Sequence, residues 1–324
     1  MTRRFVKELG DGEAIDQIFL VSEKQLRPNR QGNLYLQVRL SDKTGSMNAM
    51  LWNAQESDSQ RFANGDFVRV KGTSQLYNGG MQVIAKAFEQ VDAATVEEGD
   101  FITLSTKELD NMVSFIDRSL RGMSNFPLRN LAEHFLIDEE LMSKLRRAPA
   151  GVKNHHAYQG GLLEHVTSLM RLAAAVTPLY ENVDDDLVLF GAFLHDIGKI
   201  DELTYSPDLG YSDEGQLIGH LVLGVNILEQ KIAAANAQTP DSIPESLGLQ
   251  LKHMIVSHHG PAEYGSPKLP MTLEAIMLHY LDNIDAKMAA VTQLIEEDPN
   301  QKSNWTVYHP NMGRKFFKGG IPSE

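Results

Sequence analysis

The spacing of hydrophobic residues divides the chain into two regions with different secondary structure. In about the first 90 residues, apolar and polar positions alternate, most clearly in LYLQVRL at 34–40. This two-residue period is typical of a half-buried strand. From Ser105 to about Glu297 the apolar residues instead recur every three or four positions, the spacing of helices. The pattern predicts a β domain followed by an all-helical region, a multi-domain α+β protein.

The β region is predicted to be a small barrel. A polar segment separates the third expected strand from the fourth, and Asn78-Gly79-Gly80 is typical of a tight hairpin turn before the fifth. Three strands, a short helix and a final hairpin suit a five-stranded OB-fold, a barrel that binds single-stranded nucleic acids. The expected strands are 15–21, 34–40, 46–52, 67–72 and 81–88.

The helical region begins at a recognisable signal. Ser105-Thr106-Lys107-Glu108 matches a capping box, in which the first and fourth residues bond to each other's backbone amides. The stretch 91–101 before it, VDAATVEEGDF, is the natural linker.

Composition and charge narrow the function. The chain has no cysteine, so disulfides and thiolate metal sites are excluded and any metal ligands are nitrogen or oxygen atoms. No apolar run reaches the roughly 18 residues that span a bilayer, and the N-terminus lacks a secretory signal, so we expect a cytoplasmic protein. The net charge of −13 is uneven, because residues 1–92 carry 12 Lys and Arg against 11 Asp and Glu. Non-specific phosphate contacts are therefore expected in the N-terminal region.

Seven histidine and aspartate residues in the C-terminal two-thirds carry the candidate chemistry. Each lies in a stretch that otherwise has an apolar, helical pattern, where a polar group is costly unless it is bonded or metallated. Any one of them could be a satisfied core residue, but together they favour a site for two divalent metals sharing one carboxylate. These residues are His165, His195, Asp196, His220, His258, His259 and Asp282.

Two further histidines and three apolar residues lie near this set in the sequence. His253 and His279 are weaker alternatives as ligands. On the helix that carries Asp282, three apolar residues are expected to face the core: Ile276, Tyr280 and Ile284.

The ordered motifs resemble those of a known family. His195-Asp196 followed by IGK, with a histidine about thirty residues earlier and an aspartate about ninety later, is similar to the HD-domain superfamily of metal-dependent phosphohydrolases. The fuller series NHHAYQGGLLEHV, FLHDIGKIDEL, DEGQLIGHLVLG, VSHHG and LDNIDAKM, behind an OB-fold, resembles the YhaM-type 3′→5′ exoribonucleases of bacteria. The similarity covers nearly the whole chain, including the aromatic and basic C-terminal tail.

The resemblance implies a division of the chain and a ligand assignment. Residues 1–92 would be the OB-fold domain, 93–150 a linker with a helical extension, 151–300 the HD domain and 301–324 the tail. Two Mn²⁺ ions, or alternatively Fe²⁺ or Co²⁺, would be bound, with Asp196 bridging them. The first ion would be held by His165, His195, Asp196 and Asp282, and the second by Asp196, His220, His258 and His259, with the choice between the adjacent histidines open.

Two further residues are candidates for the reaction itself. Lys199 could bind a substrate phosphate, although a solvated lysine at a helix end is an equal alternative. His156, beside His155, could contact phosphate or protonate the leaving oxygen, with a surface histidine as the alternative. Asp196 is the central catalytic candidate, since a water held between two ions and directed at phosphorus would release a 5′-monophosphate.

The barrel offers candidate contacts to a single strand. Exposed aromatic and basic residues on one sheet face would stack on bases and bind phosphates, while an ordinary solvated face is the alternative for each. Trp52 could instead close the barrel core. The candidates are Arg27, Arg30, Tyr35, Arg39, Trp52, Arg69, Lys71 and Tyr77.

The sequence thus predicts a metal-dependent 3′→5′ exoribonuclease that acts on single-stranded RNA, with single-stranded DNA as a further substrate. Homo-oligomers are compatible with the aromatic and basic tail. The alternatives are a phosphohydrolase of small or cyclic nucleotides and a non-catalytic single-strand-binding protein. HHGPAEYGSP lacks the glutamate that directly follows the histidines in cyclic-di-GMP hydrolases.

Overall fold

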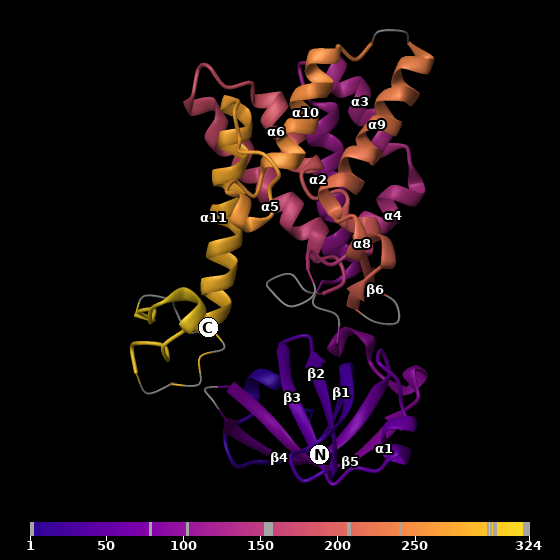
Figure 1. The fold of residues 1–324 in the computed structure, drawn as a ribbon, viewed down its shortest axis with the longest axis vertical. Coiled ribbons are helices and arrows are strands. Elements are labelled where there is room, and N and C mark those ends of the chain that lie inside the picture. Colours follow the sequence, from indigo (N-terminus) through magenta and orange to yellow (C-terminus); the bar gives the residue numbers. More distant parts are fainter. Residues whose placement is uncertain are drawn as a thin grey trace. The chain divides into compact units, whose positions relative to one another are not determined.

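The chain forms two compact units (Figure 1). The computed structural model describes residues 3–77, 80–101, 104–151, 158–205, 209–239, 242–296, 298, 300 and 303–319. One unit comprises residues 1–103 and 206–208 together with 291–324, and the other comprises 104–205 and 209–290. Of the helices in these described ranges, none combines the length and apolar character needed to cross a membrane.

The first unit contains the predicted closed five-stranded barrel, with strand order β1-β2-β3-β5-β4. The short helix α1 (Glu56–Gln60) lies between strands three and four, as expected for an OB-fold. Tyr77 pairs with Gly80 across the β4–β5 connection, and the intervening turn residues lie outside the described part. The strands are β1 (Ala14–Pro28), β2 (Leu34–Asp42), β3 (Gly45–Trp52), β4 (Phe67–Tyr77) and β5 (Gly80–Val91).

The alternation in β2 determines which side chains fill the barrel. Leu36, Val38 and Leu40 are fully buried, whereas Tyr35 and Arg39, which alternate with them along the strand, point to the opposite face and are partly exposed. Successive side chains of a strand point to opposite faces, so the same period that buries one set presents the other to solvent.

The second unit is helical, with a small hairpin of β6 (Leu203–Tyr205) and β7 (Leu209–Tyr211). The capping box at its start is confirmed, since the backbone amide of Ser105 donates to Glu108 Oε2 at 2.7 Å and the Glu108 amide donates to Ser105 Oγ at 3.3 Å. The helices are α2 (Thr106–Arg121), α3 (Phe126–Leu136), α4 (Glu139–Arg147), α5 (Gly161–Val176), α6 (Asp185–Leu194), α7 (Lys199–Glu202), α8 (Asp213–Leu217), α9 (His220–Gln238), α10 (Glu245–Ser257) and α11 (Leu273–Glu296).

Helix α6 lies at the centre of the helical core. Phe190 and Phe193 are fully buried and both contact the ring of Phe135 on α3, at centroid distances of 5.9 and 5.6 Å. Seven of its ten residues are buried. A helix that is apolar on all sides is buried on all sides, so the residues that follow its C-terminus, His195 and Asp196, enter the interior with it.

The expected orientation of α11 is wrong. Ile276, Tyr280 and Ile284 are 40%, 62% and 51% exposed and do not face the core. The helix has more apolar residues than one face can bury, and a different face packs inward. The buried residues of that face are Ala275, Leu278 and Leu281.

A close approach between α7 and α9 depends on Gly198. A Cβ atom on Gly198 would lie 2.0 Å from the carbonyl oxygen of His220 and 2.6 Å from the amide nitrogen of Gly224. Both are backbone atoms, which cannot move aside without displacing α9. The glycine therefore sets the distance between the helix that follows Asp196 and the one that begins at His220.

We expect Gly198→Ala to lower the free energy of unfolding by about 1–3 kcal/mol, the usual cost of overpacking, in thermal or urea denaturation. Gly224→Ala is the matched control on the opposite side of the same contact, where a new Cβ would meet Ile255 Cγ2 at 3.4 Å, an ordinary contact distance. Equal stability of the Gly198 variant and the wild type would show that the close approach is not required.

Candidate metal centre

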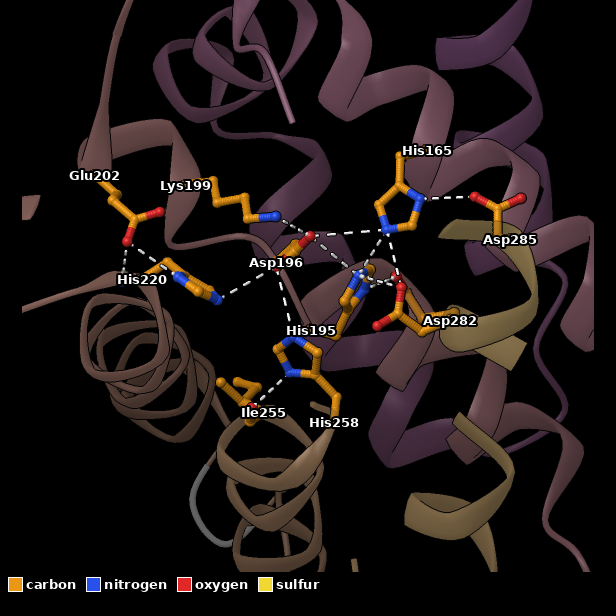
Figure 2. A network of polar contacts seen from close by, with 11 residues as sticks. His165, His195, Asp196, Lys199, Glu202, His220, Ile255, His258, Asp282 and Asp285 are labelled. Carbon is orange, nitrogen blue, oxygen red and sulfur yellow. Dashed lines mark hydrogen bonds and ion pairs between the residues drawn. The ribbon is translucent and has the colours of Figure 1, made fainter. Parts of the chain in front are cut away.

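The structure brings together all seven residues predicted to bind metal. Figure 2 labels all of them except His259. They come from five helices or the residues just beyond them. His165 lies on α5, His195 and Asp196 follow α6, His220 begins α9, His258 and His259 follow α10, and Asp282 lies on α11. They form two groups, within each of which one ligand atom per residue lies within 4.8 Å of the others.

The first group consists of His165, His195 and Asp282. The Nε2 atoms of His165 and His195 are 3.1 Å apart, and His165 Nε2 is 3.3 Å from Asp282 Oδ1. Burial alone would lower the pKa of His165, but the carboxylates of Asp282 and Asp285 raise it to about 9. A metal bound here must displace that proton, since only the neutral imidazole is a ligand.

The second group consists of Asp196, His220, His258 and His259. His220 Nε2 and His258 Nε2 lie 3.5 and 3.6 Å from Asp196 Oδ1. Burial lowers the pKa of His258, and burial together with the neighbouring His258 lowers that of His259 to about 3. Both rings are therefore neutral, with a nitrogen lone pair available to a cation.

Asp196 lies between the two groups and is 2% exposed. Its Oδ1 faces the second group, whereas its Oδ2 lies 3.3 Å from His195 Nε2 and 3.7 Å from His165 Nε2 in the first. Burial would raise the pKa of this carboxyl, but Lys199 and His195 hold it well below its usual range. An ionised carboxylate with one oxygen toward each group has the arrangement of a bridging ligand.

Hydrogen bonds on the outer side of the rings fix their orientation. The Nδ1 atom of His165 is 2.8 Å from Asp285 Oδ2, and that of His220 is 3.0 Å from Glu202 Oε1. Such partners set the tautomer and direct the other ring nitrogen at the metal. Backbone carbonyls do the same for the other two rings, Ala192 O for His195 at 2.8 Å and Ile255 O for His258 at 2.7 Å.

Sequence reasoning missed these supporting carboxylates. Asp285 comes three residues after Asp282 and so shares its helix face, a spacing that could have identified it. Ser168, three residues after His165, donates to Asp285 Oδ1 at 2.5 Å in the same way. Glu202 is harder to find, because its contact with His220 spans a hairpin and the short helix α8.

The residues present fit a pair of divalent cations. Four buried side-chain atoms of the second group, Asp196 Oδ1, His220 Nε2, His258 Nε2 and His259 Nδ1, have no hydrogen-bond partner in the described structure. Buried polar atoms without a partner are costly, and a metal would satisfy all four together. Ligands about 2.0–2.2 Å from one ion lie about 3–3.5 Å from each other. The separations of 3.1 and 3.3 Å around His165 Nε2, and of 3.5 and 3.6 Å around Asp196 Oδ1, are close to this range.

The structure places one further predicted catalytic residue, Lys199, beside the metal ligands, and it puts the two alternative histidines outside the ligand groups. Lys199 is not a solvated lysine, because its side chain is only 18% exposed and its Nζ donates to Asp196 Oδ2 at 2.7 Å. Burial would lower the pKa of Lys199, but Asp196 raises it, so the amine is charged. His156 lies outside the described residues. His253 Nε2 accepts from the Met271 amide and His279 Nδ1 contacts the His258 carbonyl, so neither is in a ligand group of the described structure.

The predicted aromatic contacts on the barrel are accessible. Trp52 is 48% exposed and Tyr77 is 60% exposed, so the alternative that placed Trp52 in the barrel core is wrong. Tyr35 is the cross-strand partner of Trp52, with ring centroids 5.3 Å apart.

The predicted basic contacts differ among themselves. Arg27 and Arg30 are exposed, and neither lies within 4 Å of a carboxylate in the described ranges. Arg69 is bound by Asp16 at 2.5 Å and Lys71 by Glu89 at 2.8 Å, so their charges are already compensated. Arg39 donates to Ser46 Oγ and lies 3.8 Å from Glu23.

Each of the two units contains a segment that matches a known protein family. The HD domain family matches residues 162–287, and the OB-fold nucleic acid binding domain family matches residues 20–91. The fold and the site therefore define a protein that joins an OB-fold to an HD-type phosphohydrolase domain.

Full-length relatives identify the family. The chain is 35% identical over 286 residues to the 3′-5′ exoribonuclease YhaM of Bacillus subtilis (strain 168), covering 88% of each chain. It is 34% identical over 308 residues to YhaM of Geobacillus sp. (strain WCH70), covering 95% of this chain and 92% of that one. The chain belongs to the YhaM family of 3′-5′ exoribonucleases, which confirms the resemblance in the sequence motifs.

We expect Asp285→Ala to weaken metal binding at one of two sites by about 10–100-fold, because the His165 ring loses the partner that orients it. Titration calorimetry of metal-free protein with Mn²⁺ measures this directly. Asp138→Ala is the matched control, since it removes a carboxylate that binds Lys231 at 2.6 Å and contacts none of the clustered histidines. Unchanged affinity in the Asp285 variant would contradict an orienting role.

Proposed function

We propose that the protein is a metal-dependent 3′→5′ exoribonuclease that shortens single-stranded RNA, and also single-stranded DNA, to nucleoside 5′-monophosphates. The buried Asp196 carboxylate carries this proposal, because its two oxygens face two separate histidine groups. Such a site suits hydrolysis of a phosphodiester. The relatives named as 3′-5′ exoribonucleases over most of their length support the direction of attack and the choice of RNA.

Two divalent ions would be held by the two groups, with Asp196 shared between them. When bound, they would polarise the phosphoryl oxygen and lower the pKa of a water. Mn²⁺ is the ion we propose, because a ligand set rich in imidazole favours it or Fe²⁺ over Mg²⁺. Either His258 or His259 could complete the second group, since an unbonded ring nitrogen of each faces it.

The chain's own residues contribute charge and orientation. Lys199 is a cation that contacts Asp196 without belonging to either ligand group, and its single charge can bind a phosphate oxygen of the substrate. Glu202 and Asp285 keep His220 and His165 in one ring orientation, so the ligand nitrogens are in position before substrate arrives. His156 is proposed to act on the leaving group from the segment before α5.

The barrel would hold the strand whose 3′ end is cleaved. Trp52, Tyr35 and Tyr77 offer faces on which bases can stack, and Arg27 and Arg30 offer unpaired charges for phosphates. Arg39, Arg69 and Lys71 would contribute less unless RNA displaces their present partners. We propose a cytoplasmic location for the enzyme.

The alternative functions are not favoured. Neither a small-nucleotide phosphohydrolase nor a non-catalytic single-strand-binding protein accounts for a chain that has both domains and whose relatives, matched over 88% of its length, are named exoribonucleases.

We expect 5′-labelled single-stranded RNA incubated with the protein and Mn²⁺ to give a descending one-nucleotide ladder on a denaturing gel. Asp196→Ala should abolish the ladder, because both ligand groups lose their shared carboxylate. Asp185→Ala, an exposed aspartate on α6, is the matched control and should retain it. Intact RNA with the wild type in Mn²⁺, Fe²⁺ and Co²⁺ would refute the proposal and favour small nucleotides.

We further propose that the protein forms homodimers through the outer face of α11. Ile276, Tyr280, Ile284 and Met288 recur at four-residue spacing and are 40–63% exposed. Residues at this spacing form a ridge, and ridges of this kind commonly pack between the same ridges of another helix. Large exposed apolar surfaces of this sort mark interaction sites.

Light scattering should give a mass about twice the 36.1 kDa of one chain. We expect Tyr280→Glu with Ile284→Glu to reduce the mass to that of one chain, because the charges would be buried in the interface. Leu249→Glu, on α10 and 65% exposed in the wild type, should leave the dimer intact. A wild-type mass of a single chain would rule out the dimer.

A further inference from the structure

The C-terminal segment 303–319 is an ordered hairpin. The Thr306 amide donates to the Phe316 carbonyl at 2.9 Å, and the His309 amide donates to the Arg314 carbonyl at 3.0 Å. The short helix Pro310–Met312 and Gly313, whose φ is +65°, form the turn between the two arms. The aromatic and basic residues of this segment therefore have fixed positions.

A buried ion pair closes the base of this hairpin. Asp298 is 6% exposed and accepts from Lys318 Nζ at 2.9 Å and from the Val307 amide at 2.8 Å. Burial would raise the pKa of Asp298, but the bonds from Lys318 and the backbone lower it, so the pair is charged. The charge of Lys318 is therefore compensated by Asp298 within the protein.

The hairpin nevertheless exposes its largest aromatic side chains. Trp305 and Phe317 are cross-strand partners with ring centroids 5.1 Å apart, and they are 51% and 53% exposed. Tyr308 is 56% exposed, whereas the small Thr306 between them is buried at 1%. A fold stabilised by its own core would bury these rings first, so their exposure indicates a surface that binds something.

The charge of the same hairpin identifies the kind of ligand. Residues 303–319 contain Arg314, Lys315 and Lys318 and no aspartate or glutamate, in a chain of net charge −13. Arg314 and Lys315 are exposed, and no carboxylate of the described residues lies within 4 Å of either. Two unpaired cations beside exposed aromatic rings suit a polyanion with stacking bases.

We propose that this C-terminal hairpin is a second binding surface for single-stranded RNA, separate from the candidate contacts on the barrel. Trp305 and Phe317 stack on bases, and Arg314 and Lys315 bind phosphates. The proposal rests on the proposed function for the identity of the ligand. A second copy of the chain is a less suitable ligand for this surface. It is negatively charged overall, but it has no bases that could stack on the exposed rings.

The two tryptophans of the chain, Trp52 and Trp305, allow a direct test. In Trp52→Phe protein the only tryptophan emission comes from Trp305. Titration with single-stranded RNA of about 12 nucleotides, in EDTA to prevent cleavage, should quench this emission saturably. Unchanged Trp305 emission at RNA concentrations that saturate binding by anisotropy would overturn the proposal.

Variants in the otherwise wild-type chain provide a second measurement. Trp305→Ala with Phe317→Ala should weaken RNA binding about tenfold or more, since two stacked bases are lost. Leu179→Ala with Tyr180→Ala, at two residues 76% and 54% exposed in the helical unit, is the matched control and should bind as the wild type does. Trp305→Phe keeps an aromatic ring and should retain most of the RNA affinity. This variant distinguishes the loss of stacking from a loss of folding.

The charges are tested separately. Arg314→Gln with Lys315→Gln should reduce the slope of log affinity against log salt by about 1.4, the value for two phosphate contacts on a single strand. An unchanged slope would contradict the phosphate contacts. A change of mass in light scattering for the Trp305 and Phe317 variant, with RNA affinity unchanged, would show a protein interface instead and refute the proposal.

Failure of this proposal and failure of the proposed function can be told apart. If RNA quenches Trp305 but the wild type gives no ladder in Mn²⁺, the hairpin is an RNA-binding surface and the proposed nuclease activity is refuted. If the wild type gives a normal ladder but RNA does not quench Trp305, the nuclease activity is supported and the second binding surface is refuted.

Discussion

The buried carboxylate of Asp196 is the constraint on which the helical unit depends. A carboxylate that is 2% exposed is costly to bury unless positive charge and hydrogen-bond donors surround it. Five helices and their ends supply these groups, namely Lys199 and the histidines of both groups. Apolar helix α6 carries Asp196 into the interior, and Gly198 allows α9 to come close enough for His220 to reach it.

The outer hydrogen bonds turn this cluster from a set of polar residues into a preorganised site. Each of four rings has its Nδ1 bonded to a carboxylate or a carbonyl, which leaves Nε2 directed inward. The Asp285–His165 contact joins residues 120 apart in the sequence. The cost of fixing these rings is met by folding, before any ion or RNA binds, as preorganised sites require.

The sequence was sufficient for the barrel, the capping box and the seven clustered residues, because each depends on local spacing or on a joint pattern. Other features depend on tertiary contacts. Arg69 and Lys71 looked like free cations, but strand pairing places Asp16 and Glu89 beside them. The face of α11 was misassigned because apolar residues surround that helix, so its periodicity does not distinguish the buried face from the exposed one.

The charge distribution supports the proposal that strand binding and chemistry fall on different parts of the chain. A protein of net charge −13 repels a polyanion unless it is locally neutral or positive where the strand is held. Residues 1–92 are close to neutral, and 303–319 carry only positive charges. Both segments belong to the unit that lacks the histidine cluster. Around that cluster, Asp196, Asp282 and Asp285 leave an excess of negative charge that divalent cations would reverse, so attraction of phosphate to the site depends on metal occupancy.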